Sequence, residues 1–502
     1  MKLPGSPLEL VDVVSGYGLE DYEAIAHLAP AAAELRAEAA VALRRLAGRT
    51  VWMVSSTATG GGVAEMLGQL VRILRDIGVT TQWVVIGSRE PAFFELTKRI
   101  HNLIHGTGDP EFTDSDRDLF ELVNRENAAA LRQIVRPGDV LVVHDPQPVP
   151  LGGLLREAMP LHAIWRCHIG LDFENRATRA AWAFLGPYLN AYDHAVFSAP
   201  EYIPERLAKR STVIHPGVDP LSPKNRDLTL RETVEVLCNG GLIPYPSPTV
   251  HGLFPALAQR VGPDGTLAPA HLGDSVGLLT RPIVTQVSRW DRLKGFLPLL
   301  RAFAALKGSA APDPVADPVH HRRHQLVRLV LAGPEPAAVA DDPEATEVLE
   351  EMIAAYRRMP RAVQNDIALL LLPMRSPVQN ALIVNALQRA STIVVQNSLR
   401  EGFGLTITEA MWKRIPVLSN SRACGPRQQV RDGLDGRLVR DPEDEAELQR
   451  VLNDMLGDSE ARQRWGRAAQ RHVHERFLVF AQLRSWARLV DAIVTDRAVV
   501  RP

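Results

Sequence analysis

Residues 398–410 read Ser-Leu-Arg-Glu-Gly-Phe-Gly-Leu-Thr-Ile-Thr-Glu-Ala and follow a short apolar run at 392–395. The run is typical of a buried strand, and Gly402 and Gly404 permit a tight turn because glycine adopts backbone angles that other residues avoid. A helix is predicted to begin near Leu405. A strand that turns through glycines into a helix is the repeating unit of a parallel α/β sheet.

The same rhythm recurs on both sides of this segment, as short apolar runs separated by helical stretches. Continuous apolar runs of this kind predict parallel strands covered by helices on both faces of a sheet. We therefore expect two Rossmann-like, doubly wound α/β domains, with ligands bound in a cleft that the carboxyl edges of the two sheets face. The predicted strands are 51–54, 82–86, 140–143, 163–165 and 195–197 in the first half, and 283–287, 326–331, 367–372, 392–395 and 416–418 in the second.

The predicted domain boundaries follow the interruptions in this rhythm. Residues 1–225 form a first domain with leading helices, and 283–480 form a second. Between them, 226–282 is rich in proline and glycine, which indicates an inserted loop or linker. Residues 481–502 are predicted to form a terminal helix and tail.

Length and composition set further bounds. With 502 residues the chain is long enough for two or three domains, and 46% hydrophobic with 23% charged residues is ordinary globular composition. The 57 Lys and Arg against 58 Asp and Glu leave a net charge of −1, so no general attraction to nucleic acid or anionic membranes is expected. No apolar run is long enough for a membrane helix.

The cysteines and the N-terminus suggest the compartment. Cys167, Cys238 and Cys424 are odd in number and far apart, so neither a disulfide framework nor zinc-ligand spacing is present. The first residues contain no apolar signal core. We therefore expect a cytoplasmic protein.

Two segments that follow predicted strands suit an anionic ligand, one because it is rich in glycine and the other because it carries two cations. Gly60, Gly61 and Gly62 precede a predicted helix, whose free N–H groups can bind an anion. They match neither a dinucleotide fingerprint nor a P-loop, which disfavours hydride transfer and ATP hydrolysis. Arg289 and Lys294 follow strand 283–287 and could neutralise a diphosphate, or be two solvated surface cations.

The segment quoted first carries two carboxylates across its glycine turn. Glu401 stands before the turn and Glu409 about one turn into the helix. Backbone N–H groups from Gly402 to Leu405, which include Phe403, could face phosphate, while the carboxylates bind sugar and ribose hydroxyls. The alternative is a capped helix with two surface acids.

Histidines end two predicted strands of the first domain. His144 and Asp145 follow strand 140–143, and His168 follows strand 163–165. The carboxyl edge of a parallel sheet is where ligands bind, so these side chains are candidates for sugar hydroxyls. A histidine at a strand end can equally be structural. No Gly-x-Ser-x-Gly elbow occurs, which disfavours a serine hydrolase.

Two patterns resemble metal sites and are interpreted otherwise. Asp114-Ser115-Asp116 precedes a predicted helix, where Asp and Ser serve as caps. The histidines at 320, 321 and 324 lie in a segment, 308–324, that is predicted to be a surface loop. We expect no dedicated metal site.

At Glu401 and Glu409 the sequence resembles the retaining glycosyltransferases with two Rossmann-like domains, the GT-B fold. It is most similar to the branch of trehalose glycosyltransferring synthases and trehalose phosphorylases. The resemblance runs in order from about residue 50 to 480. The matching segments are 55–67, 93–102, 144–148, 165–169, 219–225 and 396–405.

The resemblance implies transfer of glucose, with retention, from a nucleoside-diphosphate glucose to a second glucose, giving α,α-trehalose. Glu401 and His168 would contact the donor sugar, Glu409 the ribose, and Arg289 and Lys294 the diphosphate. Phosphate and acceptor oxygens would meet Gly60–Gly62. Neither a cofactor nor a metal is obligatory, although Mg²⁺ could assist, and a homodimer is expected from base rate alone.

The chain departs from this branch at three places. Gly170 stands where Asp is usual after His-Ile, residues 216–219 read Pro-Gly-Val-Asp instead of Pro-Ser-Ile-Asp, and the insert near 230–282 is longer. The first departure lies beside the predicted sugar pocket and concerns the acceptor. The donor-binding residues match the family pattern better than the residues on the acceptor side. The alternatives are phosphorolysis of trehalose, a different acceptor, or a non-catalytic sugar-nucleotide-binding regulator.

Overall fold

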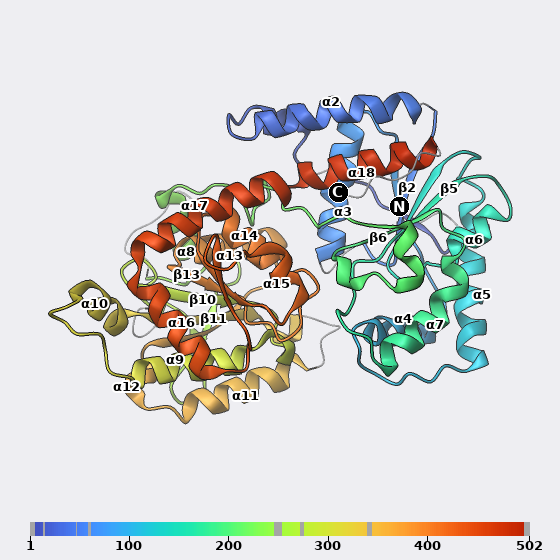
Figure 1. Ribbon diagram of the computed structural model, residues 1–502. Helices are drawn as coiled ribbons and strands as arrows, with labels where there is room; N and C mark the ends of the chain where they lie inside the picture. Colours follow the sequence, from blue (N-terminus) through green and yellow to red (C-terminus); the bar gives the residue numbers. More distant parts are fainter. Residues whose placement is uncertain are drawn as a thin grey trace. The chain divides into compact units, whose positions relative to one another are not determined.

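The computed structural model describes residues 6–13, 16–46, 48–58, 62–244, 254–271, 276–338 and 344–495. The chain divides into two compact units (Figure 1). The N-terminal unit comprises Met1–Gly217 with Phe477–Pro502, and the C-terminal unit comprises Val218–Arg476. Each unit is built around its own sheet.

The N-terminal unit contains a sheet of seven strands within the described residues, in the order β1-β3-β2-β4-β5-β6-β7. All neighbouring strands are parallel except β1 and β3. Their cores are continuous apolar runs, as expected for strands covered on both faces. The strands are β1 (Glu9–Leu10), β2 (Val51–Ser55), β3 (Thr81–Val85), β4 (Val140–His144), β5 (His162–Arg166), β6 (His194–Phe197) and β7 (Ser211–Val213).

Helices follow most of these strands and place their amphipathic faces on the sheet. They are α1 (Leu19–Glu23), α2 (Ala29–Arg45), α3 (Gly62–Asp76), α4 (Pro91–Ile104), α5 (Asp114–Leu131), α6 (Leu151–Arg156), α7 (Arg176–Leu189) and α18 (Val479–Val494), with short 3₁₀ turns η1 (Pro200–Tyr202) and η2 (Glu205–Arg210).

The C-terminal unit has eight strands in its described part, in the order β15-β14-β13-β10-β11-β12-β8-β9. The strands from β15 to β12 are parallel, and β8 and β9 add an antiparallel edge. They are β8 (Gln259–Val261), β9 (Leu267–Pro269), β10 (Ile283–Val287), β11 (Arg328–Pro334), β12 (Ile367–Leu372), β13 (Ile393–Val395), β14 (Val417–Asn420) and β15 (Gly436–Val439).

The first helix of this unit, α8, precedes its strands, and the others lie between the strands or follow the last of them. They are α8 (Leu230–Asn239), α9 (Phe296–Gly308), α10 (Pro318–Leu326), α11 (Ala345–Arg357), α12 (Arg361–Gln364), α13 (Pro377–Arg389), α14 (Leu405–Trp412), α15 (Cys424–Gln429), α16 (Glu445–Gly457) and α17 (Ser459–Arg476), with η3 (Arg292–Lys294) and η4 (Pro336–Ala338). The predicted α/β class with two mostly parallel sheets is confirmed.

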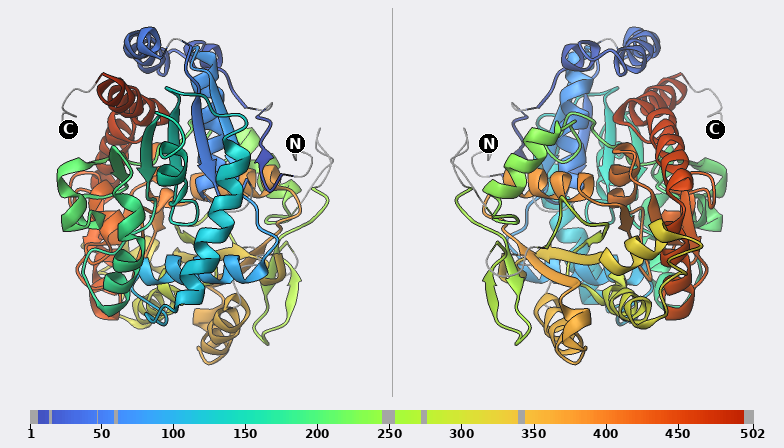
Figure 2. Two further views of the ribbon diagram at one scale, coloured as in Figure 1. Left: turned by 90° about the vertical axis from the view of Figure 1, so that its right-hand side faces the viewer. Right: turned by 90° about the vertical axis from the view of Figure 1, so that its left-hand side faces the viewer.

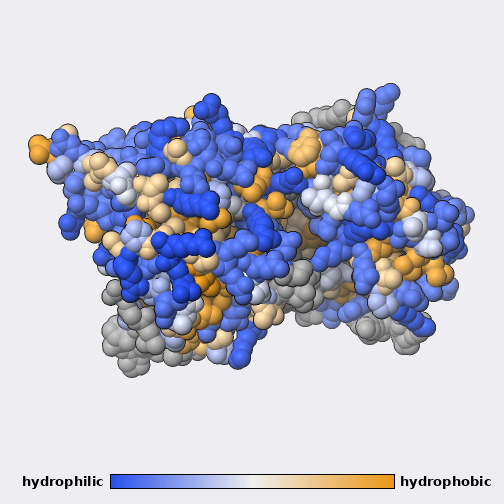
Figure 3. Space-filling model, turned by 90° about the horizontal axis from the view of Figure 1, so that it is seen from below, coloured by the Kyte–Doolittle hydropathy of each residue, from blue (hydrophilic) through white to orange (hydrophobic). Residues whose placement is uncertain are grey.

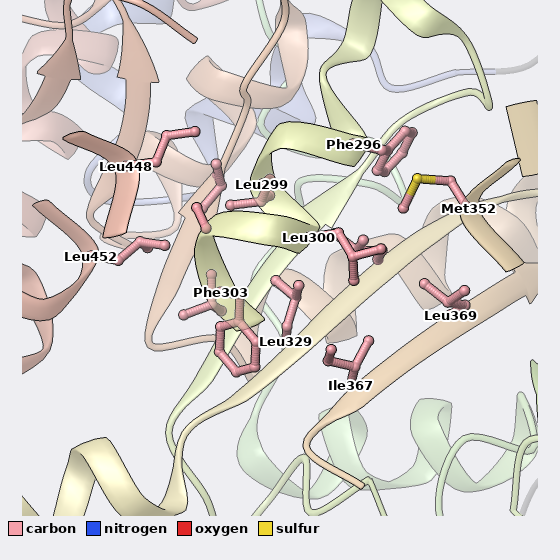
Figure 4. Close-up of a cluster of buried hydrophobic side chains, with 14 of the residues drawn as sticks. Phe296, Leu299, Leu300, Phe303, Leu329, Met352, Ile367, Leu369, Leu448 and Leu452 are labelled. Carbon is pink, nitrogen blue, oxygen red and sulfur yellow. The ribbon is translucent and has the colours of Figure 1, made fainter. Parts of the chain in front are cut away.

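The largest described core of the C-terminal unit lies between α9 and the sheet (Figure 4). Leu299, Leu300 and Phe303 of α9 recur at helical spacing and are fully buried. Figure 4 shows them facing Leu329 and Ile367 from the strands. This packing fixes the strand β10 and the helix that follows it, between which the candidate site residues Arg289 and Lys294 are held.

The predicted linker at 226–282 is instead part of the C-terminal unit. It forms α8 and the β8–β9 hairpin, which stands at the edge of the sheet (Figure 2). Thr229 and Glu232 form a reciprocal capping box that starts α8. The prolines around these elements obscured that signal, and the pairing of β8 with β12 joins residues far apart in sequence. Residues 245–253 and 272–275 of this segment lie outside the described part.

The chain changes units earlier than predicted, after residue 217 rather than 225. The reason is that residues 219–227 are tied to α13: Asn385 donates its Nδ2 to the carbonyl oxygens of Pro223 and Arg226, at 3.0 and 2.9 Å.

The terminal helix α18 belongs to the N-terminal unit, so the second boundary also differs from the predicted 480/481. Its Phe480 ring packs edge-on to Tyr22, with centroids 5.1 Å apart, and Arg488 pairs with Glu38 on α2 at 2.6 Å. Figure 1 shows α18 running beside α2.

The histidine segment was predicted as a loop, and its second half is the helix α10. Asp317 caps the helix by accepting the His320 N–H at 2.9 Å, and Pro318 occupies the first helical position. His324 is buried.

The face drawn in Figure 3 is mostly hydrophilic, with smaller hydrophobic patches between. None of the described helices combines the length and apolar character that crossing a bilayer requires.

Candidate active site

The loops after the adjacent parallel strands β10 and β13 carry the first group of candidate residues, within the C-terminal unit. Gln286, buried on β10, donates to the Lys294 carbonyl at 2.7 Å and accepts the Asn397 N–H at 3.1 Å. Gly295 between the loops has φ +63°, and a Cβ there would overlap the Asn397 carbonyl oxygen. The two loops therefore lie in close contact, and only glycine fits at 295.

Glu401 and Lys294 form an ion pair at the centre of this arrangement. Lys294 Nζ lies 2.7 Å from Glu401 Oε2, and the two side chains are only 17% and 14% exposed. The same oxygen accepts from Ser398 Oγ at 3.0 Å and lies 3.4 Å from Gln396 Nε2. Three donors on one oxygen fix the position of the carboxylate.

The surroundings keep Glu401 ionised. Burial, the largest single influence, raises the pKa of its carboxyl. The charge and hydrogen bond of Lys294, the Ser398 hydroxyl and the charge of Arg289 together outweigh burial, so the pKa lies below its ordinary value. Glu401 is thus held as an anion that can accept hydrogen bonds from hydroxyl groups.

Arg289 lies at the carboxyl end of β10, as predicted. Its guanidinium is about half exposed, with Nη2 3.9 Å from Asp291 Oδ2. It is close enough to contribute to the lowered pKa of Glu401. The structure thus brings Arg289, Lys294 and Glu401 into one electrostatic group.

The glycine turn between the two glutamates has the predicted geometry. Gly404 has φ +85° and is the N-cap residue of α14, which begins at Leu405. Phe403 is buried, and its carbonyl oxygen accepts from Gln429 Nε2. This hydrogen bond holds the turn against α15. At Gly402 there is open space where a Cβ would lie.

Glu409 lies on α14 and is buried rather than exposed as a surface acid would be. Its Oε1 is 3.8 Å from Nζ of Lys224, which follows the crossing into the C-terminal unit. Behind it, Lys413 is buried and donates to the Glu409 carbonyl at 3.1 Å. The reading of Glu401 and Glu409 as solvated helix-end acids is therefore wrong.

The second group of candidates lies in the N-terminal unit, at the ends of β4 and β5. His144 Nδ1 and His168 Nε2 are 3.0 Å apart, so one ring donates to the other. Burial, followed by the charge of Arg166, lowers the pKa of His144 to about 3. Burial, Arg166 and His144 also lower the pKa of His168. Both imidazoles are therefore neutral hydrogen-bonding groups near pH 7.

Asp145 is held in a strained backbone conformation, with φ +65°. Three contacts maintain it: its N–H donates to the Arg166 carbonyl, its carbonyl accepts from Trp165 Nε1, and its Oδ1 accepts the His168 N–H. Burial raises the pKa of this carboxyl to about 6, against the opposing effects of the His168 N–H and Arg166. The structure thus brings Asp145 and His168 into contact at the ends of β4 and β5.

The glycine loop can be placed only in part. Gly60 and Gly61 lie outside the described residues, and Gly62 is the first residue of α3.

The Asp114-Ser115-Asp116 pattern serves as a helix start. Thr113 is the N-cap residue of α5, and Asp116 completes the capping box and pairs with Arg99 at 2.8 Å. Throughout the described ranges, no group of three or more His, Cys, Asp or Glu side chains is placed to hold a metal ion.

Four residues with clear roles in this geometry were not predicted as site residues: Gln396, Ser398, Lys224 and Arg166. Gln396 and Ser398 lie only a few residues before Glu401, so their place at a strand end was a usable signal. Lys224 and Arg166 approach their partners through the tertiary fold, and nothing in their local sequence indicates it.

Comparisons with known proteins show the family to which the chain belongs. Residues 53–204 match the family described as trehalose synthase, N-terminal domain, and residues 375–472 match glycosyl transferases group 1. A trehalose synthase from Thermococcus litoralis is 32% identical over 480 residues, covering 95% of this chain and 97% of the relative. The chain belongs to the trehalose synthase family.

This member of the trehalose synthase family is a glycosyltransferase with the GT-B fold. It also resembles a trehalose phosphorylase from Pleurotus sajor-caju, at 26% identity over 78% of this chain but only 51% of the phosphorylase. Among solved structures, an α,α-trehalose-phosphate synthase (UDP-forming) from Burkholderia xenovorans superposes with a TM-score of 0.61. It covers 88% of this chain and all of the other at 16% identity, which is a likeness of fold.

Proposed function

We propose that this protein transfers glucose from a nucleoside-diphosphate glucose to free glucose with retention of configuration, forming α,α-trehalose. The observation that carries the proposal is the Lys294–Glu401 pair with Arg289 beside it, in a chain of the trehalose synthase family. Two cations and an ionised carboxylate, on loops that Gln286 joins through the backbone of Lys294 and Asn397, suit a diphosphate leaving group attached to a sugar.

The donor is bound by the C-terminal unit in this proposal. Arg289 and Lys294 bind the diphosphate, and their charges stabilise it as it leaves. Glu401 accepts hydrogen bonds from the donor sugar, and Glu409 from the ribose. The backbone N–H groups of the turn from Gly402 to Leu405, at the start of α14, face phosphate oxygens.

The sugars are bound with the help of the N-terminal unit. His168 uses Nε2 for His144, so Nδ1 is the ring nitrogen that a sugar hydroxyl would contact. Asp145 and His144 complete this hydrogen-bonding group, and the loop Gly60–Gly62 contacts phosphate and acceptor oxygens. Neutral imidazoles suit hydrogen bonding to hydroxyl groups rather than pairing with a charged group.

Retention follows from attack on the same face as departure. The acceptor oxygen forms a bond to the anomeric carbon while the bond from that carbon to the phosphate oxygen breaks. The acceptor proton passes to the departing phosphate, so no enzymic base is required. Lys294 and Arg289 neutralise the charge that develops on the diphosphate.

Three further points remain proposals. We infer that no metal is obligatory, because two cationic side chains already serve the diphosphate. Activity that persists in EDTA and does not rise with added Mg²⁺ would support this.

A cytoplasmic location and a homodimer stay predictions, which fractionation and sedimentation would test.

Product analysis by NMR tests the function. The protein is incubated with UDP-, ADP- or GDP-glucose and free glucose. Nucleoside diphosphate release with α,α-trehalose is the expected result, and the donor that reacts is thereby identified. Release only with another acceptor moves the substrate, and trehalose cleavage that requires inorganic phosphate identifies a phosphorylase.

Glu401→Gln is the matched variant for this test. The amide keeps the size of the side chain and removes its charge. Loss of turnover in a folded variant is expected, and full activity would contradict the site. Glu460→Gln on α17, an exposed helical acid, serves as the control.

A further inference from the structure

Lys413 is a buried amine just after α14 whose hydrogen bonds join three separate segments. Its Nζ donates to Asn225 Oδ1 at 3.1 Å, to Gln388 Oε1 on α13 at 2.7 Å and to the Glu409 carbonyl at 3.1 Å. An ammonium group has three donors, so all three are used. The amine therefore ties α13, α14 and the segment around residue 225 together.

The segment 219–227 is itself rigid. Asn225 donates its Nδ2 to Ser222 Oγ at 3.0 Å, which leaves Oδ1 for Lys413. Asn385 donates its Nδ2 to the carbonyls of Pro223 and Arg226, on either side of Lys224 and Asn225 in the sequence. Asn225 is thus oriented from both ends, and its neighbour Lys224 is directed at Glu409.

Glu401 and Glu409, the two carboxylates on either side of the glycine turn, each have a lysine partner. Lys294 lies 2.7 Å from Glu401, and Lys224 lies 3.8 Å from Glu409. The second pair is the longer one, and its lysine is the more exposed of the two, at 27% against 17%. Lys224 is therefore placed to contact a ligand that Glu409 binds.

We propose that Lys224 is a further binding residue for the nucleoside diphosphate part of the donor, and that Lys413 is the positioning residue that holds Lys224 and Glu409 in place. The proposal rests on the proposed role of Glu409 in binding the ribose. The Lys224 ammonium would donate to ribose or phosphate oxygens beside that carboxylate.

The charge state of Lys413 gives the arrangement a pH dependence. The charged groups facing the amine are Glu409 on α14, Arg389 on α13, and Lys224 and Asp227 of the loop. Burial lowers the pKa of Lys413 to about 7, with Glu409 opposing the shift. Above that pH the neutral amine has two donors for three acceptors, so one of the joining bonds is lost.

Calorimetric titration with UDP-, ADP- and GDP-glucose tests both residues. The diphosphate diester of these ligands does not titrate between pH 6.5 and 8.5, so pH effects report on the protein. Lys224→Ala is expected to raise Kd by about tenfold, the loss of one charge-assisted hydrogen bond. The control Arg231→Ala removes an exposed cation paired with Glu235 on α8 and should leave Kd unchanged.

In the unmodified protein, Kd should rise from pH 6.5 to 8.5. Lys413→Met should weaken binding at pH 6.5 and abolish the rise. Asn225→Ala removes one of the three acceptors of Lys413 and keeps the lysine itself. If Lys413→Met does not fold, this variant should show the same weakening of binding.

Each outcome decides a separate claim. An unchanged Kd in Lys224→Ala overturns its binding role, and a pH-independent Kd in the unmodified protein overturns the role of Lys413. Binding of a sugar nucleotide that does not depend on Lys224 leaves the proposed function intact. Absence of binding by all three ligands overturns both.

Discussion

Replacing Lys294 with methionine removes the positive charge beside Glu401 while keeping a side chain of similar length. In the unmodified protein the pKa of Glu401 is lowered from 4.5. The ionised group therefore stabilises the fold above that pH, and the stabilisation is lost as pH falls below it. Without Lys294, burial is the largest remaining influence, and we expect the pKa of Glu401 to rise well above 4.5.

The magnitude follows from proton linkage. At pH 7 the Glu401 carboxylate of the variant must either stay charged without a partner or take up a proton, and both cost free energy. We expect the free energy of unfolding to fall by about 3 kcal/mol, the lower end of the range for breaking a buried ion pair. Each pH unit over which only the folded state holds that proton changes stability by about 1.4 kcal/mol. The loss should therefore shrink by up to about 2.8 kcal/mol over the two pH units between pH 7 and pH 5.

Urea unfolding at both pH values measures this difference. Arg156→Met is the control, since it breaks a more exposed ion pair, that of Arg156 with Asp193 at 2.8 Å. Its loss should be small at both pH values, as for other surface ion pairs. Adding Glu401→Gln to Lys294→Met should restore most of the stability. An equal loss at both pH values for Lys294→Met would refute the reasoning.

Three further predictions concern the N-terminal unit. A Cβ on Gly170 would overlap the ring of Tyr202, so Gly170→Ala should lower stability by about 1–3 kcal/mol, as overpacking does; thermal unfolding should show no such loss in a Tyr202→Ala background. The Asp145 carboxyl has a pKa of about 6, so kcat/KM should fall as pH drops through 6 if the anion binds a hydroxyl, and Asp145→Asn should be slow and lack this limb; an unchanged profile contradicts the role. His144 and His168 should show no ring titration by NMR between pH 5 and 8, and a pKa near 6.5 for either ring would exclude the neutral pair.

Much of the site was predictable because its signals are local. The turn from Gly402 to Leu405, the cations after β10 and the histidines at the ends of β4 and β5 each occupy a strand-to-helix connection. In a parallel sheet such connections collect at one edge, so their positions follow from the strand pattern.

Other features could not be predicted from local signals. The pairing of Lys224 with Glu409 joins residues 185 positions apart, and the bond from Lys413 to Asn225 joins residues 188 positions apart. The prolines of 226–282 indicated a linker, yet hydrogen bonds from β8 to β12 make it part of the sheet. The departure at Gly170 became intelligible only once Tyr202 was seen to fill the space beside it.

By itself the sequence determined the two α/β units, the glycine turns and the residue types at the strand ends, because apolar periodicity and backbone sterics act over a few residues. The tertiary structure decided which unit receives α18, which lysine meets each glutamate, and that His144 and His168 are neutral while Glu401 is charged. These depend on burial and on charges brought together from distant segments, since desolvation and Coulomb forces act on distance in space and not along the chain.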